Sequence, residues 1–292
     1  MAQRFDTITF LSDYGTGDEF VGVVHSVIRS IAPQVTIIDL THEIPPYDVR
    51  AGSLTLGRAA QYLCPGVVLA VVDPGVGTPR RAVAIEVGDG QSCLVGPDNG
   101  LLASAVAMCG GATAVVELTN PEYQLAAPGP TFAGRDVFAP AAAHLCLGVP
   151  LDELGPAVDP VSLLPGLLPL TREEGGALVA EVLWVDRYGN CQLNVDPAEV
   201  AQLGDRVQLQ WADDVRTAVR RSTYEGIDAG QVGVVVDSYG MLSICLGRRS
   251  AAAELRIGVG TEVTLRAPGD DAPPADAGPA SQPVTFTPRG PT

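Results

Sequence analysis

The chain has 292 residues, enough for one large domain or two ordinary ones, and a hydrophobic fraction of 46% supplies ample material for a core. Its net charge of −16, with only 18 lysines and arginines, argues against nucleic acid as a partner, because phosphate contacts need clustered cations. No apolar run reaches the roughly 18 residues of a transmembrane helix, so the sequence predicts no membrane segment.

The N-terminus and the cysteines bear on the cellular compartment. Residues 1–6 lack the basic and apolar regions of a signal peptide. The six cysteines are scattered without a CxxC pair, and there are only three histidines, which argues against a zinc site and against a disulfide framework. We therefore expect a cytoplasmic protein that binds no metal.

Strand-like and helix-like segments alternate through the first half of the chain. The expected strands cover residues 7–11, 35–40, 67–72, 82–87, 92–95 and 113–118. The expected helices cover residues 17–31, 48–63, 101–109 and 137–147, and Asp48 is placed to cap the second of them. Such alternation is typical of helices that cover a mostly parallel sheet, so we expect an α/β domain over residues 1–165.

The pattern changes after a proline-rich stretch, and we expect a linker at residues 166–175. Short apolar segments separated by turn residues then follow, at 177–185, 191–195, 205–210, 232–236, 241–245 and 261–265. This spacing predicts a smaller all-β, barrel-like domain over residues 176–266. Proline, alanine, glycine and aspartate dominate residues 267–292, which we expect to be a disordered tail.

The strand expected at residues 67–72 ends in Asp73, and a Pro/Gly turn then leads to Arg80 and Arg81. An acid at the carboxyl end of a strand in an α/β protein lies where such folds bind ligands. A chain reversal could return the Arg80 guanidinium to the Asp73 carboxylate. The alternative is a hairpin that carries an ion pair on its surface.

Further polar residues follow strand ends in the first half. Asp13 could accept both hydroxyls of a ribose or belong to a helix-capping turn, and Tyr47 could stack on a flat ring or simply pack. Asn99 could bind a ligand or cap a helix, and Gly134 permits the close approach of a ligand. His42, in a proline-rich turn, is better explained as a hydrogen-bonding residue than as a catalyst.

Two polar turns follow apolar strands in the second half, at residues 186–190 and 237–240. They are either plain hairpin loops or a site that holds a zwitterionic amino-acid group. The chain has no Gly-rich P-loop, no GxSxG elbow and no HExxH motif, so nucleotide hydrolysis, serine-hydrolase chemistry and zinc-peptidase chemistry are unsupported.

Seven motifs occur in order along most of the chain: FLSDYGTGDEFVG, DLTHEIPPYDVRAG, VVDPGVGTPRR, LVGPDNGLL, TFAGRDVFAPAAA, VDRYGN and DSYGMLSI. Together they resemble the S-adenosylmethionine (SAM) hydroxide adenosyltransferases, which are adenosine-forming SAM hydrolases related to the fluorinase and the chlorinase. The resemblance implies an N-terminal α/β domain joined to a C-terminal β domain. It also implies a homotrimer in which SAM lies between the N-terminal domain of one subunit and the C-terminal domain of its neighbour.

The resemblance assigns expected roles by motif position. SAM would be the substrate, with adenosine and methionine as products and no cofactor. Asp13 would hold the ribose hydroxyls, Tyr47 would line the adenosine pocket, and the backbone near Arg248 would approach the adenine edge. The other expected substrate-binding residues are Asn99, Gly134, Asp186, Tyr188, Asn190, Ser238 and Tyr239.

The hydrolases of this family position water with an aspartate, an arginine and a histidine. Asp73 and Arg80 match the first two, and Ala133 stands where the pattern has histidine, through either natural divergence or an engineered substitution. We expect hydrolysis of SAM by attack of water or hydroxide on the ribose 5′ carbon, slowed by the missing imidazole.

Two alternatives to this hydrolysis remain open. One is a SAM-dependent halogenase that uses chloride, against which Asp73 argues because a carboxylate repels an anion. The other is a SAM- or adenosine-binding protein whose catalysis is impaired by Ala133.

Overall fold

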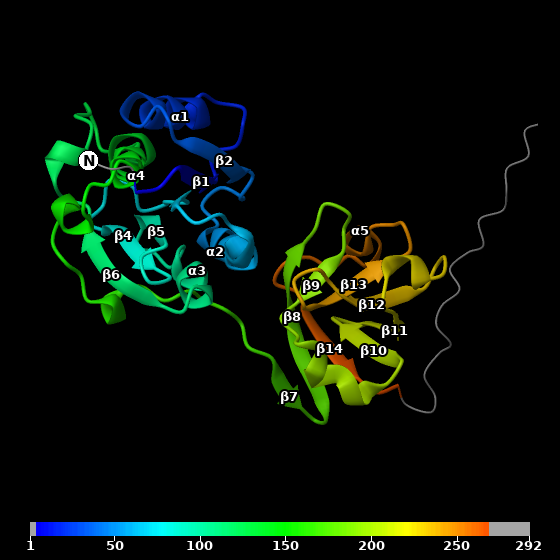
Figure 1. The fold of residues 1–292 in the computed structure, drawn as a ribbon. Helices are drawn as coiled ribbons and strands as arrows, with labels where there is room; N and C mark the ends of the chain where they lie inside the picture. Colours follow the sequence, from blue (N-terminus) through cyan, green and yellow to red (C-terminus); the bar gives the residue numbers. More distant parts are fainter. Residues whose placement is uncertain (1–3, 269–292) are drawn as a thin grey trace, which may run out of the picture. The chain divides into compact units, whose positions relative to one another are not determined.

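The computed structural model describes residues 4–268. The part of the expected disordered tail that follows residue 268 lies outside the described residues. The chain divides into two compact units between Leu167 and Leu168, and the linker predicted at residues 166–175 spans this division (Figure 1).

A six-stranded sheet forms the centre of the first unit. Its strands, in order across the sheet, are β2 (Thr36–Thr41), β1 (Thr7–Ser12), β3 (Val67–Val71), β5 (Ser92–Pro97), β4 (Ala82–Val87) and β6 (Ala112–Glu117). β2, β1, β3 and β5 pair in parallel, whereas β4 pairs antiparallel with both β5 and β6. The expectation of a mostly parallel sheet is therefore wrong, because the sheet is mixed.

The short connection between β4 and β5 explains why these two strands are antiparallel. Residues 88–91 alone join β4 to β5, and a parallel pair would need a crossover of a dozen residues or more. Gly88 and Gly90 take positive φ angles of 59° and 83°, as a tight hairpin turn requires. The four residues between the strands predicted at 82–87 and 92–95 already indicated an antiparallel pair.

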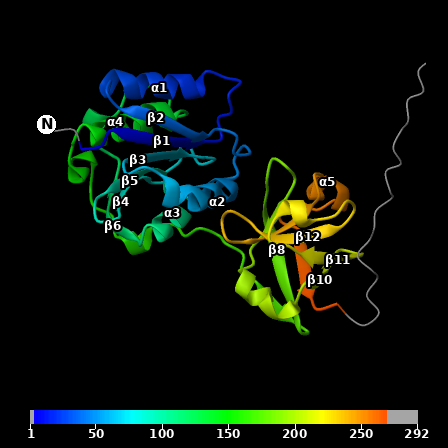
Figure 2. The same cartoon turned by 45° about the vertical axis from the view of Figure 1, so that its right-hand side comes forward.

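Helices cover both faces of the sheet (Figure 2). α1 (Phe20–Ile31) packs on α4 (Ala139–Cys146), and α2 (Val49–Ala59) packs on α3 (Ala103–Met108). As predicted, Asp48 caps α2, since its carboxylate accepts a hydrogen bond of 2.8 Å from the Ala51 N–H. Short 3₁₀ turns occupy Ala60–Tyr62, Pro121–Tyr123, Leu151–Leu154, Pro160–Ser162, Pro197–Leu203 and Tyr224–Gly226.

A single π-helical turn, Gly134–Phe138, precedes α4. Pro140 has no N–H to donate to the Asp136 carbonyl, and the Leu125 N–H donates to it instead, at 2.8 Å. The irregular turn therefore ties the preceding loop to the start of α4. Such π-turns are frequent at functional sites.

The second unit is a small barrel with one added strand. Its strands are β8 (Ala177–Val185), β9 (Cys191–Leu193), β10 (Arg206–Trp211), β11 (Asp214–Arg220), β12 (Val232–Val236), β13 (Leu242–Leu246) and β14 (Glu262–Arg266), with β7 (Arg172–Glu174) paired to β8. Pairing of β14 with β8 closes a ring of seven strands, which confirms the barrel-like prediction. The sequence analysis missed three elements: β7, which lies within the predicted linker at residues 166–175; β11, which carries three charged residues and no alternating apolar pattern; and the short helix α5 (Ala251–Leu255).

All six cysteines are free thiols, and four of them are buried. Burial raises the pKa of the Cys245 thiol to about 12, which keeps it protonated and unreactive at neutral pH. Among residues 4–268, no helix is both long enough and apolar enough to cross a membrane.

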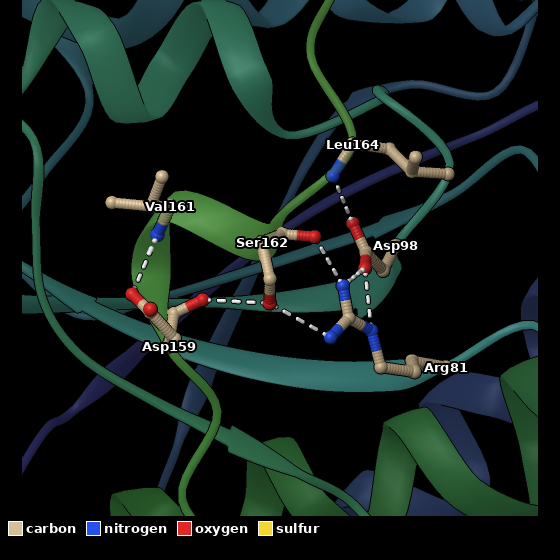
Figure 3. Close-up of polar contacts among 6 residues, drawn as sticks. All are labelled: Arg81, Asp98, Asp159, Val161, Ser162 and Leu164. Carbon is tan, nitrogen blue, oxygen red and sulfur yellow. Dashed lines mark hydrogen bonds and ion pairs between the residues drawn. The ribbon is translucent and has the colours of Figure 1, made fainter.

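A buried carboxylate holds the end of the first unit to its sheet (Figure 3). Asp98, directly after β5, accepts hydrogen bonds from the Arg81 Nε–H and from the Leu164 backbone N–H, both at 2.8 Å. The Arg81 guanidinium also donates to the Ser162 hydroxyl and to the Ser162 carbonyl, at 2.9 and 2.5 Å. Asp98 therefore fixes the last residues of the first unit.

We expect Asp98→Ala to destabilise the protein, because the substitution leaves the Arg81 guanidinium and the Leu164 N–H without their shared acceptor. Leaving such groups unsatisfied costs about 1–3 kcal/mol. Urea unfolding should report this loss, and Asp152→Asn, at an exposed aspartate, should stay within about 0.5 kcal/mol of the parent. Equal unfolding midpoints for Asp98→Ala and the parent would contradict the structural role of Asp98.

Candidate active site

A buried ion pair lies at the carboxyl end of β3. The Arg80 Nε–H donates to both Asp73 oxygens, at 2.9 and 3.1 Å, and Arg80 Nη2 contacts Oδ2 directly. The Asp73 side chain is 6% exposed and that of Arg80 is 16% exposed. The chain reversal thus returns the guanidinium to the carboxylate, and the pair is buried rather than on the surface.

Two consecutive turns produce the reversal. The Thr78 N–H and hydroxyl both donate to the Gly75 carbonyl, at 3.1 and 2.6 Å. Gly77 has a φ of 78°, and a Cβ there would lie 3.1 Å from the Pro130 carbonyl oxygen. Glycine is therefore required at residue 77 by its backbone angle, and any side chain would crowd the neighbouring loop.

Two neighbours hold the ion pair in place. The Arg80 guanidinium lies over the Phe138 ring, 5.2 Å from its centroid, in a cation–π contact. The Asn99 side-chain amide donates to the Val72 carbonyl at 2.9 Å, one residue before Asp73. Asn99, predicted to bind substrate, is thus placed to position the strand end that carries Asp73.

A cavity of about 330 Å³ opens beside Asp73, within the range of small-molecule sites. Its wall brings together several residues that the sequence analysis selected: Asp13, Tyr47, Asp73, Ala133 and Gly134. A second cavity, of about 480 Å³, is lined by Arg80 and Asp136 and shares Ala133 with the first. The small side chain of Ala133 therefore borders both spaces.

Asp13 and Tyr47 meet at the cavity wall. The Tyr47 backbone N–H donates to Asp13 Oδ2 at 2.9 Å, which fixes the carboxylate after β1. Tyr47 has a φ of 68° and is 75% exposed, so its ring is not packed into the core. The carboxylate is available to a polar ligand, and the ring is available to a flat one.

Tyr14 also lines this cavity, although the sequence analysis assigned it no role. Because Tyr14 follows Asp13 directly, the sequence could have indicated it as a candidate site residue.

The predicted residues of the second unit lie on two turns of the same design. Asp186 Oδ1 accepts hydrogen bonds of 2.8 Å from the N–H groups of Tyr188 and Asn190. Asp237 Oδ1 likewise accepts from the N–H groups of Tyr239 and Met241, at 2.8 and 3.1 Å. Both turns are therefore hairpin loops, and the ring of Tyr188 is exposed.

The two turns are neighbours, because β9 pairs with both β8 and β13. The Gln192 amide donates to Asp237 Oδ2 at 2.6 Å, and the ring of Tyr239 packs edge-on against Trp184 with centroids 6.0 Å apart. Ser238 lies in the same turn.

The loop that contains Arg248 reaches the first of these turns. A Cβ on Gly189 would lie 2.0 Å from the Ser250 hydroxyl oxygen, and the Ala252 N–H donates to the Gly189 carbonyl at 2.9 Å. Arg248 itself has a φ of 57° and pairs with Glu225 at 3.0 Å. The structure thus groups the predicted residues of the second unit at one set of loops.

His42 is buried and hydrogen-bonded, as the sequence analysis predicted. Its Nδ1 lies 2.8 Å from the Ser12 hydroxyl, and its Nε2 lies 3.0 Å from Asp39, which also contacts His25 at 2.9 Å. Within the described part of the chain, these three side chains form the one group whose ligand atoms all lie within 4.8 Å of one another, as metal binding would require. Hydrogen bonds among them account for the same arrangement.

Two matches now identify the family. Residues 8–155 match the SAM hydroxide adenosyltransferase N-terminal domain, and residues 180–264 match the C-terminal domain of the same name. The chain belongs to the SAM hydroxide adenosyltransferase family. The two matched segments fall on either side of the division between the two units.

The relatives of this chain bear two names, SAM hydrolase and fluorinase. The chain is 44% identical over 260 residues to an "(R)-S-adenosyl-L-methionine hydrolase" of Salinispora tropica, covering 89% of this chain and 97% of that one. It is 42% identical over 268 residues to a hydrolase of the same name from Thermus thermophilus, covering 88% and 98%. A fluorinase of an Actinoplanes species is 28% identical over 288 residues, covering 88% and 96%.

A solved structure has the same fold. An uncharacterized conserved protein from Thermotoga maritima superposes with a TM-score of 0.82 at 34% identity, covering 89% of this chain and 99% of that one.

The histidine–aspartate cluster predicts a pH effect on stability. Burial alone would raise the pKa of Asp39, but hydrogen bonds from His42 and His25 outweigh it and hold that pKa below 3.8. A lowered carboxyl pKa contributes stability that is present above the ordinary value and is lost as the pH falls through the folded-state value. Asp39→Asn should therefore lower the melting temperature at pH 6, and the difference from the parent should shrink below about pH 4.

Thermal unfolding of both proteins between pH 6 and pH 3 measures this effect. The exposed Asp152→Asn variant serves as the control and should follow the parent throughout. An Asp39→Asn deficit of constant size across the range would show that the charge of Asp39 is not what stabilises the fold.

Proposed function

We propose that this chain hydrolyses S-adenosyl-L-methionine to adenosine and L-methionine. The observation that carries the proposal is the buried Asp73–Arg80 pair at the wall of a cavity that also contains Asp13, in a member of this family. Two relatives with more than 40% identity bear the name SAM hydrolase, whereas the fluorinase is more distant.

The reaction needs a positioned nucleophile more than an acid. A bond forms between the oxygen of water and the ribose 5′ carbon, while the bond between that carbon and the sulfonium sulfur breaks. The electron pair stays on sulfur, so methionine leaves as a neutral thioether and needs neither a proton nor a cofactor. Holding the water in line can lower the barrier by about 7–11 kcal/mol in favourable cases.

Asp73 and Arg80 have different roles toward the attacking water. The Asp73 carboxylate orients the water and accepts its proton, which then passes to solvent. The Arg80 guanidinium fixes that carboxylate through two nitrogens and places a positive charge where hydroxide character develops. Ala133 contributes only a methyl group to this part of the wall.

The remaining contacts are assigned by the positions of the family motifs. The Asp13 carboxylate would accept the ribose hydroxyls, and the Tyr47 ring would cover the adenosine. Asp186, Tyr188, Asn190, Ser238, Tyr239 and the backbone at Arg248 would surround the adenine or the methionine part.

We further propose a homotrimer in which the second unit of a neighbouring subunit supplies these last contacts. Analytical ultracentrifugation tests this assembly. The free cysteines favour a reducing compartment, and we place the enzyme in the cytoplasm.

Product analysis distinguishes the hydrolase from the two alternatives. The protein is incubated with SAM, with and without chloride, and the products are separated by chromatography. Adenosine supports the proposal, 5′-chloro-5′-deoxyadenosine would indicate a halogenase, and unchanged SAM with measurable binding would indicate a binding protein. The Asp73 carboxylate disfavours the halogenase because it repels chloride.

Asp73→Asn should reduce adenosine formation by about 10²–10⁴-fold, because the amide keeps the shape of the carboxylate but cannot accept the proton. The affinity for SAM, measured by calorimetry, should change little.

Asp98→Asn is the matched control for this variant. It alters a buried aspartate paired with the neighbouring arginine, outside the cavity, and should lose stability while keeping most of the turnover. Adenosine formation by Asp73→Asn at the rate of the parent would remove Asp73 from the mechanism.

A further inference from the structure

Three aromatic rings hold the ring of Tyr14 in one place. Its centroid lies 6.4 Å from that of Phe10, 5.7 Å from that of Phe20 and 5.6 Å from that of Phe132. The contacts with Phe10 and Phe132 are edge-on, at 74° and 80°, an arrangement that aromatic pairs prefer. A phenol clamped in this way directs its hydroxyl to a fixed point.

That point lies at the start of the π-helical turn. A Cβ on residue 134 would be 2.1 Å from the Tyr14 hydroxyl oxygen and 3.1 Å from Cζ, so the hydroxyl occupies the space that only a glycine leaves open. Tyr14, Asp73 and Ala133 all line the same cavity. The need for glycine at residue 134 is thus explained by the tyrosine at residue 14.

The Tyr14 phenol, which lines the same cavity as Asp73, is held in its neutral form. Burial is the main cause that raises the pKa of Tyr14 far above its ordinary value of 10.0, and the carboxylates of Asp13 and Asp73 raise it further against the opposing effect of Arg80. The phenol therefore stays neutral at physiological pH. A neutral phenol can donate one hydrogen bond and accept another.

We propose that the Tyr14 hydroxyl is the third polar group of the water site, acting beside Asp73 and Arg80 where Ala133 has no polar atom; this rests on the proposed function. The hydroxyl donates a hydrogen bond to the oxygen of the attacking water. One water hydrogen then faces the Asp73 carboxylate, and the remaining lone pair faces the ribose 5′ carbon. Tyr14 exchanges no proton in the step, so its task is to orient the water.

Tyr14→Phe isolates this role, because it removes one oxygen atom and leaves the clamped ring in place. We expect kcat for adenosine formation to fall about 10²–10³-fold, as for the loss of a preorganised hydrogen-bond donor. KM for SAM and the melting temperature should change little. Tyr123→Phe, at a half-buried tyrosine that packs edge-on against His144, is the control and should retain the parent kcat.

Ala133→His provides a test that a merely structural role of Tyr14 would not pass. Residue 133 borders the same cavity, so an imidazole there can hydrogen-bond the same water. If both groups serve one water, Ala133→His should raise kcat in the Tyr14→Phe background by a larger factor than in the parent. Equal factors in the two backgrounds would show that the groups act independently and would overturn the inference.

The outcomes separate this inference from the proposed function. If the parent forms no adenosine, the proposed function and this inference both fail. If the parent forms adenosine and Tyr14→Phe forms it equally fast, only this inference fails. A Tyr14→Phe protein whose KM rises while kcat is unchanged would place the hydroxyl on the substrate and would likewise overturn it.

Discussion

The buried ion pair of Asp73 and Arg80 constrains how the first unit builds its cavity. Burying a carboxylate at a strand end is costly unless a cation accompanies it, and removing one partner of such a pair typically costs about 3–5 kcal/mol. To deliver the guanidinium, the chain reverses within seven residues, which requires Gly77 and brings the loop at Pro130 close. The guanidinium then rests on Phe138, at the end of the π-helical turn. The wall of the cavity is thus assembled around a single pair of charges.

Local signals predicted much of the fold, and they failed where two elements had to be compared. The cap at Asp48 and the strand that precedes Asp73 follow from a few adjacent residues. The direction of β4 depends on the length of the turn at residues 88–91, which the alternation of strands and helices does not reveal. β11 was missed because its sequence has no alternating apolar pattern, and its pairing with β10 decides its conformation.

The residues of the candidate site also fall into two groups: those that local sequence patterns indicate and those that only tertiary contacts reveal. Asp13 and Asp73 could be selected because they follow strands of an α/β sheet, at the carboxyl ends where such folds bind ligands. The position of Tyr14 could not, because it depends on three rings from separate segments and on the missing side chain at Gly134. Asn99 lay in a recognisable motif, yet its hydrogen bond to the Val72 carbonyl is a tertiary contact that no pattern of residues indicates.

The matching turns of the barrel have a consequence for the entropy of ligand capture. The Oδ1 atoms of Asp186 and Asp237 each accept hydrogen bonds from two backbone N–H groups of their own turn, so the backbone there is ordered before any ligand arrives. Ordering a loop on binding costs about 1–2 kcal/mol for each residue whose backbone is fixed, and these turns have already met that cost during folding. A ligand that contacts Tyr188 would then restrict little more than the rotamers of that exposed ring. For a ligand bound at these turns, most of the freedom lost on binding would therefore belong to the ligand and not to the barrel.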